Sequence, residues 1–320
     1  MSLVRLSIIL FVFLGLCSCT ALVSEYLQKS NSFSYDSITS DNQIESLGFK
    51  KGKYCSSESK ACISYLSGGP INNKCMKYHT ELKSGSYDTE VTLNLSRESV
   101  PDGISGTIVL IHGFRASKEF MLNSALYFRF LGFNVLVPDL LGHGESEGRK
   151  TFGVRDRHII DELITSEHSP EKNLFVLGNS MGAVTAAYLS TMRVDIKGVI
   201  LQAPMLRFDE AVLRYTTTNY PYLKYIFNDK DILLGATAAL SKENLTVQDT
   251  DIKPILASEN VPVLLFASSQ DLVAPYKSFA DLNSDMVLVK ELLNRNHPSM
   301  GVVDNKDSKI IIDWLKELMQ

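Results

Sequence analysis

The segment Gly178-Asn179-Ser180-Met181-Gly182 places a serine between two glycines in the pattern Gly-x-Ser-x-Gly. An apolar run, residues 174–178, precedes the serine, and a stretch with helical character, residues 181–193, follows it. A serine on a sharp turn between a buried strand and a helix holds its hydroxyl above the edge of the sheet. The start of the helix also favours a developing negative charge. The pattern therefore predicts that Ser180 is a nucleophile.

A serine hydroxyl needs a neighbouring base to act as a nucleophile at neutral pH. When the nucleophile lies on a turn of this kind, an acid and then a histidine follow it along the chain. His297 is the only histidine after Ser180, and it lies in a polar segment. Asp271 comes just after an apolar run and is the predicted acid that orients the imidazole. Asp209 or Glu210 is the alternative acid.

Acyl transfer also needs backbone N–H groups that stabilise an oxyanion. Met181 N–H, immediately after the nucleophile, is one predicted donor. The second is Phe114 N–H, in a loop after a predicted strand, where Gly113 lets the chain turn toward the site. Neighbouring polar residues are expected to fix loops rather than to react: His112, Asp139 and His143.

Short apolar runs alternate with amphipathic stretches over most of the chain, which predicts a mostly parallel sheet with helices on both faces. The interval 204–258 is longer than one crossover needs, so we expect a helical insertion over one end of the sheet. A half-buried strand is predicted at 91–95. The remaining predicted strands are 107–111, 134–138, 174–178, 198–203, 262–267 and 286–290. The predicted helices are 21–28, 117–131, 154–166, 181–193, 275–283 and 307–319, the last capped by Asp307.

Five segments resemble the α/β-hydrolase superfamily, and specifically its serine esterase, lysophospholipase and monoacylglycerol-lipase-like branch. They are IHGF (111–114), PDLLGHGES (138–146), GNSMG (178–182), SSQDLVAP (268–275) and NH (296–297). The resemblance covers about residues 85–320. It implies an α/β-hydrolase fold with a helical cap insertion, together with the triad and oxyanion donors named above. Two positions depart from the family's pattern. Asn179 stands where the lipase-like branch often has His, and Leu140-Leu141 stands where Arg is often seen.

The expected reaction is hydrolysis of a carboxylic ester through a covalent acyl-enzyme. A short to medium acyl chain or a lipid ester is favoured because the insertion is rich in aromatic and aliphatic residues. No metal or organic cofactor is implied. The same triad also serves thioesterases, amidases or peptidases, and acyltransferases, which are alternatives. A non-catalytic envelope lipoprotein that reuses the fold as a binding module is the alternative from another class.

The first 18 residues predict a signal peptide, because Arg5 precedes an apolar run at 6–16 that is too short to span a bilayer. Leu16-Cys17-Ser18-Cys19 resembles a bacterial lipoprotein box, which implies lipidation of Cys19 and a lipid anchor. Because Thr20 follows Cys19, this resemblance implies that the protein is sorted to the outer membrane if the source is Gram-negative. Plain secretion is the alternative.

Residues 19–84 are predicted to form a tether and a cysteine-containing N-terminal region, ahead of a hydrolase domain at 85–320. Cys55, Cys62 and Cys75 allow one disulfide and one free thiol, and the sequence does not choose the pair. A disulfide is favoured over a zinc site because export leads to an oxidising compartment.

The composition is typical of a folded globular protein, with 45% hydrophobic and 21% charged residues and a formal net charge of −4. The chain has no basic excess, so nucleic acid is not an expected partner. The expected partners are a small-molecule or lipid ester substrate and the membrane that holds the lipid anchor. The oligomeric state does not follow from the sequence.

Overall fold

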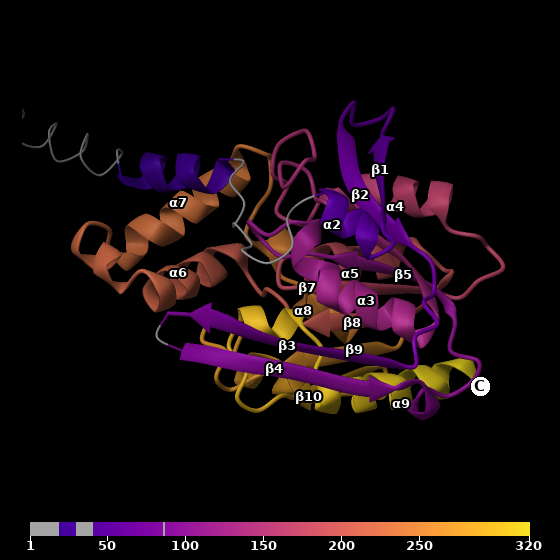
Figure 1. Cartoon of the computed structure of the whole chain (residues 1–320). Helices are drawn as coiled ribbons and strands as arrows, with labels where there is room; N and C mark the ends of the chain where they lie inside the picture. The colour runs from indigo at the N-terminus through magenta and orange to yellow at the C-terminus, as the bar shows by residue number, and fades with distance from the viewer. Residues whose placement is uncertain (1–18, 30–40, 86) are drawn as a thin grey trace, which may run out of the picture.

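The computed structural model describes residues 19–29, 41–85 and 87–320, and its centre is a large sheet (Figure 1). The strands of this sheet are β1 (Lys50–Cys55), β2 (Cys62–Gly68), β5 (Gly106–Ile111), β6 (Phe133–Pro138), β7 (Leu174–Asn179), β8 (Ile196–Gln202), β9 (Val263–Ala267) and β10 (Val287–Glu291). They lie in the order β1-β2-β6-β5-β7-β8-β9-β10. The six strands from β6 to β10 in this order are parallel, as predicted.

Two antiparallel strands extend the parallel part of the sheet at one edge. β1 pairs with β2, and β2 pairs with β6. Both strands come from the region that the sequence analysis placed ahead of the hydrolase domain. The expected boundary at residue 85 therefore does not coincide with an edge of the central sheet. The predicted signal peptide, residues 1–18, lies outside the described residues.

Helices cover both faces of the sheet. They are α2 (Asp41–Ser46), α3 (Leu122–Leu131), α4 (Asp156–Glu167), α5 (Gly182–Met192), α6 (Phe208–Asn219), α7 (Asp229–Ser241), α8 (Lys253–Ala257) and α9 (Asn305–Met319). In β7, the Phe175 ring packs on Trp314 of α9 with centroids 6.3 Å apart. A Cβ at Gly178 would instead lie 2.6 Å from the Ala183 Cα of α5. Residues three apart in a strand point to opposite faces, so α9 and α5 cover different faces.

The buried strands explain the apolar runs of the sequence. Every residue of β5 and of β7 is buried. A strand covered on both faces gains from an apolar side chain at each position, and so its sequence does not alternate. None of the helices in the described ranges combines the length and the apolar character that a membrane span requires.

A separate hairpin of two long strands, β3 (Cys75–Ser84) and β4 (Tyr87–Ser96), lies outside the central sheet. It packs beside the N-terminus of α9. The Tyr78 hydroxyl donates to Val303 O, and the Asn94 amide donates to Asn305 Oδ1 at 2.8 Å. The sequence predicted only residues 91–95 of this hairpin as a strand.

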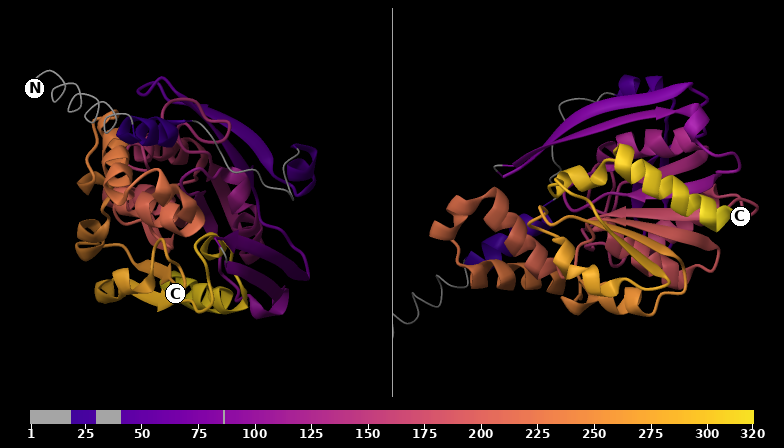
Figure 2. Two further views of the ribbon diagram at one scale, coloured as in Figure 1. Left: turned by 90° about the vertical axis from the view of Figure 1, so that its left-hand side faces the viewer. Right: turned by 90° about the horizontal axis from the view of Figure 1, so that it is seen from below.

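The interval 204–258 contains α6, the 3-10 helix η3 (Pro221–Tyr225), α7, the 3-10 helix η4 (Gln248–Thr250) and α8. We call α6, η3 and α7 the cap, because they project from one end of the molecule (Figures 1 and 2). A helix at residues 19–28 lies along α7. Gln28 Nε2 donates to Ala239 O at 2.9 Å, and a Cβ at Gly235 would lie 2.4 Å from Val23 Cγ1.

Two predicted helix features are wrong. Residues 275–283 do not form an α-helix but two 3-10 turns, η5 (Tyr276–Ser278) and η6 (Ala280–Leu282), because φ of −126° at Phe279 interrupts the helical path between them. The last helix begins two residues earlier than expected, at Asn305. Its N-cap is Asp304, whose side chain accepts from Lys306 N at 2.7 Å and Asp307 N at 2.8 Å, so Asp307 is the third residue of a capping box.

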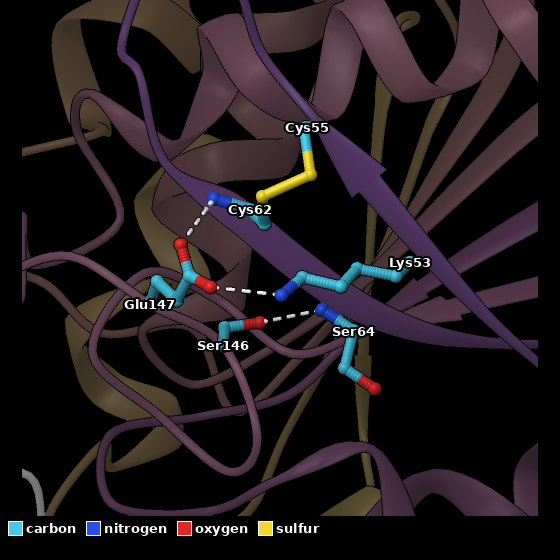
Figure 3. The surroundings of a disulfide bond; sticks show 6 residues. All are labelled: Lys53, Cys55, Cys62, Ser64, Ser146 and Glu147. Atoms are coloured by element: carbon cyan, nitrogen blue, oxygen red, sulfur yellow. Dashed lines mark hydrogen bonds and ion pairs between the residues drawn. A yellow bond between two sulfur atoms is a disulfide. The ribbon is translucent and has the colours of Figure 1, made fainter.

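The structure selects one cysteine pair, Cys55–Cys62 (Figure 3). The two residues are directly opposite each other on β1 and β2, with Cα atoms 3.9 Å apart. The Cys62 amide donates to Glu147 Oε2 at 3.2 Å, and Lys53 Nζ lies 2.8 Å from Glu147 Oε1. Cys75 is a free, exposed thiol at the start of β3. The disulfide and Glu147 therefore tie the antiparallel edge to the segment that follows β6.

Candidate active site

Ser180 lies on a sharp turn between β7 and α5. Its φ of +51° is in the left-handed region, which a residue with a Cβ adopts only under constraint. A Cβ at Gly178 would lie 2.4 Å from Gly182 O, and a Cβ at Gly182 would lie 2.2 Å from Ile111 O. No side chain larger than hydrogen fits at either position, which explains both glycines of the motif.

The loops after three different strands bring Ser180, Asp271 and His297 together. His297 Nε2 lies 3.0 Å from Ser180 Oγ, and His297 Nδ1 lies 2.7 Å from Asp271 Oδ2. The two ring nitrogens therefore link the hydroxyl to the carboxylate. Because the carboxylate accepts, Nδ1 carries the hydrogen and Nε2 is left to accept the serine proton.

Asp271 is completely buried and held by its own loop. Its Oδ1 accepts the Val273 and Ala274 amides at 2.8 and 2.9 Å, which leaves Oδ2 for the imidazole. The alternative acids lie elsewhere, near the start of α6. Asp209 Oδ2 is 2.8 Å from Arg207 Nη2, and Glu210 Oε1 is 3.7 Å from Arg207 Nη1.

His297 is held by the β3–β4 hairpin through the residue before it. Asn296 Nδ2 donates to Leu82 O at 2.8 Å and to Tyr87 O at 3.0 Å, so one side chain joins both strands. Asn296 Oδ1 accepts the Ser299 amide at 3.1 Å and closes the turn that contains His297. The sequence analysis missed this role, because no local pattern indicates that residues 82–87 lie beside residue 296.

The two predicted oxyanion donors flank Ser180. Met181 follows it directly, and a Cβ at Gly113 would lie 3.1 Å from Ser180 Cβ, which places the Gly113-Phe114 loop against the serine. Within the part of the chain that the structure describes, neither the Met181 nor the Phe114 amide donates to a protein acceptor. The arrangement leaves two N–H groups beside one hydroxyl, as an oxyanion site requires.

His112 is a structural histidine that joins two loops. Its Nε2 accepts the Leu140 amide at 3.0 Å, and its Nδ1 donates to Gly113 O at 2.8 Å. Burial lowers the pKa of His112, so the imidazole is neutral and has one donor and one acceptor nitrogen. Burial likewise lowers the pKa of His143 well below its usual value, and His143 Nδ1 lies 3.0 Å from Leu141 O.

A fully buried lysine, Lys118, fixes the loop after β6. Its Nζ lies 2.7 Å from Asp139 Oδ2 and 2.8 Å from Glu145 Oε2. Burial opposes the charge, but the two carboxylates raise the pKa of Lys118 above its ordinary value. The hydrogen bond from Lys118 lowers the pKa of Glu145 to about 2. Asp139 also accepts the Lys118 amide at 2.7 Å, so it stabilises two loops beside the site.

The cap packs on the oxyanion loop through largely buried aromatic side chains. Phe208, the first residue of α6, packs on Phe114 and Phe152 with centroids 5.4 and 4.5 Å away. A cleft of about 400 Å³ opens between α6 and the Asp271 loop. Its lining residues are Arg214, Ser269, Leu272, Pro275 and Lys277. The described residues contain no group of three or more His, Cys, Asp or Glu side chains that could hold a metal ion.

A family model matches residues 102–230, and that family is described as serine aminopeptidase, S33. The chain is 28% identical over 156 residues to caffeoylshikimate esterase of Arabidopsis thaliana, which covers 46% of this chain and 45% of that protein. It is 34% identical over 98 residues to lipase 1 of Psychrobacter immobilis, covering 29% and 30% of the two chains. The matched region thus spans less than half the length of these curated relatives.

Among solved structures, an esterase of Pyrococcus furiosus superposes with a TM-score of 0.58 at 15% identity, over 91% of this chain and 97% of that one. This likeness extends over almost the whole chain and includes the mostly parallel sheet with its flanking helices. The chain therefore has the α/β-hydrolase fold. The family match, which includes the nucleophile turn, and the match to the plant esterase support an α/β-hydrolase superfamily.

Proposed function

We propose that the protein is a serine hydrolase that cleaves carboxylic esters through an acyl-enzyme. The observation that carries this proposal is the continuous hydrogen-bonded line from Ser180 Oγ through His297 to Asp271. Each contact lies within the distance that proton transfer requires. The esterase and lipase names of the curated relatives support the same reaction class.

In the proposed reaction, Ser180 Oγ attacks the ester carbonyl carbon while His297 Nε2 takes the hydroxyl proton. The carbonyl oxygen becomes an oxyanion that accepts hydrogen bonds from the Phe114 and Met181 amides. The C–O bond to the alcohol then breaks, and the imidazolium returns its proton to the leaving oxygen. Water, deprotonated by His297, attacks the acyl carbon and releases the acid, and the proton returns to Ser180. Asp271 stabilises the imidazolium in both steps.

The substrate that we propose is an ester with an apolar acyl group, including lipid esters. The apolar residues Leu272 and Pro275, which line the cleft beside the Asp271 loop, support this, because apolar side chains favour the burial of a hydrocarbon chain. The family description favours a second candidate, hydrolysis of a peptide at its amino terminus. Thioester hydrolysis and acyl transfer to another alcohol would use the same residues.

We also propose that the protein is exported and held at the cell envelope by a lipid on Cys19. The sequence around Cys19 carries this proposal. Exposed apolar side chains on the helix at residues 19–28 and on the cap support attachment to a membrane, among them Leu22, Tyr225 and Leu234.

A fluorophosphonate probe and a panel of esters graded by acyl length test the enzymatic proposal. The probe reacts with a serine only when a neighbouring base and oxyanion site activate it. We expect the wild type to be labelled and to hydrolyse at least one ester, and Ser180→Ala to lose both properties, with a fall in kcat of at least about 10³-fold.

Ser190→Ala is the matched control. Ser190 lies near the other end of α5, where its hydroxyl donates to Glu259 Oε2 at 2.6 Å. Labelling and turnover should match the wild type. If folded wild-type protein neither reacts with the probe nor hydrolyses any ester, the proposed function is wrong and the binding-module alternative is favoured. A panel of amino-acyl amides in the same assay distinguishes the peptidase candidate.

A further inference from the structure

The helix at residues 19–28 contacts the loop that contains Phe114. Arg115, the residue after Phe114, donates from Nη1 to the Tyr26 hydroxyl at 2.7 Å. The Arg115 guanidinium also lies 5.2 Å from the centre of the Tyr26 ring. Tyr26 thus binds Arg115 in two ways, through its hydroxyl and through its ring. The two residues are 89 positions apart in the chain.

A second cation joins the same helix to Phe114 itself. Lys150 is completely buried, and its Nζ lies 4.7 Å from the centre of the Phe114 ring. The same Nζ is 3.4 Å from Leu27 O. Leu27 lies in the last turn of the helix, where carbonyl groups have no partner within the helix and the dipole favours a cation. Both contacts connect the C-terminal half of this helix to residues 114 and 115.

The loop around Phe114 needs such a constraint. Arg115 has a φ of +60°, in the left-handed region, and the Ala116 amide donates to Gly113 O at 3.2 Å across the turn. The turn leaves Phe114 N–H free to bind an oxyanion. An oxyanion donor accelerates the reaction only if it is already oriented before charge develops. A small displacement of the Phe114 amide would therefore weaken stabilisation of the transition state more than it weakens binding of the substrate.

We propose that Tyr26 is a positioning residue for the oxyanion hole, and that it acts on the Phe114 amide through Arg115. This proposal rests on the proposed function, which assigns the oxyanion role to Phe114. The helix is also bound to α7, so a single element connects the cap to the oxyanion loop. The segment directly after the predicted lipidation site is thus part of the active-site architecture rather than a passive tether.

Tyr26→Phe tests the proposal, because it removes the hydroxyl that accepts from Arg115 and keeps the ring. We expect kcat for a good ester to fall about tenfold with KM within about twofold, since only the transition state uses the oxyanion donors. Affinity for a boronic acid, which forms a tetrahedral anion on the serine, should fall by a similar factor. Affinity for the ester's product alcohol should not change.

Tyr54→Phe is the matched control, because the Tyr54 hydroxyl on β1 also forms a hydrogen bond with a charged side chain, here by donating to Glu162 Oε2 at 3.1 Å. It should leave kcat and boronate affinity unchanged. If Tyr26→Phe keeps the wild-type kcat and boronate affinity, or if Tyr54→Phe lowers them equally, the proposal is overturned.

Hydrogen exchange provides a readout that does not depend on activity. In Tyr26→Phe, amide exchange of the peptide that spans residues 112–117 should become faster, whereas Tyr54→Phe should leave it unchanged. Unchanged exchange in Tyr26→Phe would overturn the positioning role even if the enzyme is active. If the wild type hydrolyses no ester, the proposed function fails, and the exchange data still decide whether Tyr26 constrains the loop.

Discussion

Three side chains from distant parts of the sequence form one continuous line of hydrogen bonds, and each is held by a different local interaction. The strained turn fixes Ser180 at a φ of +51°. Two backbone amides fix Asp271, and the hairpin fixes the turn of His297 through Asn296. Because each of the three residues has a support outside the triad, the geometry is set before a substrate binds. Preorganisation of this kind lowers the barrier of an acyl transfer.

The role of Asp271 can be tested by comparison with the other candidate acid. In Asp271→Asn, the amide oxygen can still accept from Val273 and Ala274, which turns the NH2 group toward His297 Nδ1. The imidazole then carries its hydrogen on Nε2 and cannot accept the Ser180 proton, so kcat should fall by about 10³–10⁴. Asp209→Asn should stay within about threefold. Loss of ester turnover in Asp209→Asn alone would disprove the assignment.

At the scale of elements, two buried lysines, Lys118 and Lys150, lie in the loops around the site. Lys118 is surrounded by carboxylates, so its charge is compensated. Lys150 is different, because the polar contact that the structure gives it is a carbonyl, Leu27 O. Burial, followed by repulsion from Arg115, lowers the pKa of Lys150 to about 8, from an ordinary value of 10.5. Lys118 thus stabilises its loop, whereas burial of the charged Lys150 side chain lowers the free energy of unfolding.

This difference predicts a pH dependence of stability. Between pH 8 and 10.5 the unfolded chain holds the Lys150 proton and the folded chain does not, so the free energy of unfolding rises with pH. Below pH 8 both states are protonated and the cost is constant. Relative to Lys150→Met, the wild type should gain about 2 kcal/mol between about pH 7 and about pH 9.5. Urea denaturation of both proteins measures this. A difference that does not change with pH would contradict the lowered pKa.

At the scale of the whole molecule, the N-terminal part of the chain is distributed over both ends of the structure. The helix at 19–28 packs on the cap, whereas β1 and β2 extend the edge of the central sheet (Figure 1). The β3–β4 hairpin then reaches the His297 turn. The described residues up to Ser96 therefore contribute to the cap, the sheet and the candidate active site.

The proposed lipid anchor can be tested by replacing Cys19. After expression in a bacterium supplied with an alkyne-labelled fatty acid, the wild type should be labelled and should sediment with membranes. Cys19→Ala should lose the label and become soluble, because one or more acyl chains provide most of the membrane affinity. Cys75→Ala removes the exposed free thiol and should behave as the wild type. Wild-type protein that is unlabelled and soluble would favour plain secretion.

The sequence by itself determined the six parallel strands and the turn that contains Ser180. Each of these depends on local patterns, namely continuous apolar runs and glycines at fixed distances from a serine. The sequence also named the residues that the structure places in contact, because a single histidine follows Ser180 and Asp271 follows a buried strand. It could not choose the disulfide, since Cys55 and Cys62 pair only because β1 and β2 are antiparallel.

The tertiary structure decided the contacts between residues far apart in the chain. These contacts leave no periodic signal in the sequence, because each depends on how two separate elements pack. They are the contacts of Asn296 with the hairpin, of Lys118 with Asp139, and of Tyr26 with Arg115. The prediction of a helix at 275–283 was wrong for a related reason. Local helix propensity does not include the constraint that the loop holding Asp271 places on these residues. Local patterns thus specified the candidate reactive groups, and packing between distant segments specified what holds them in place.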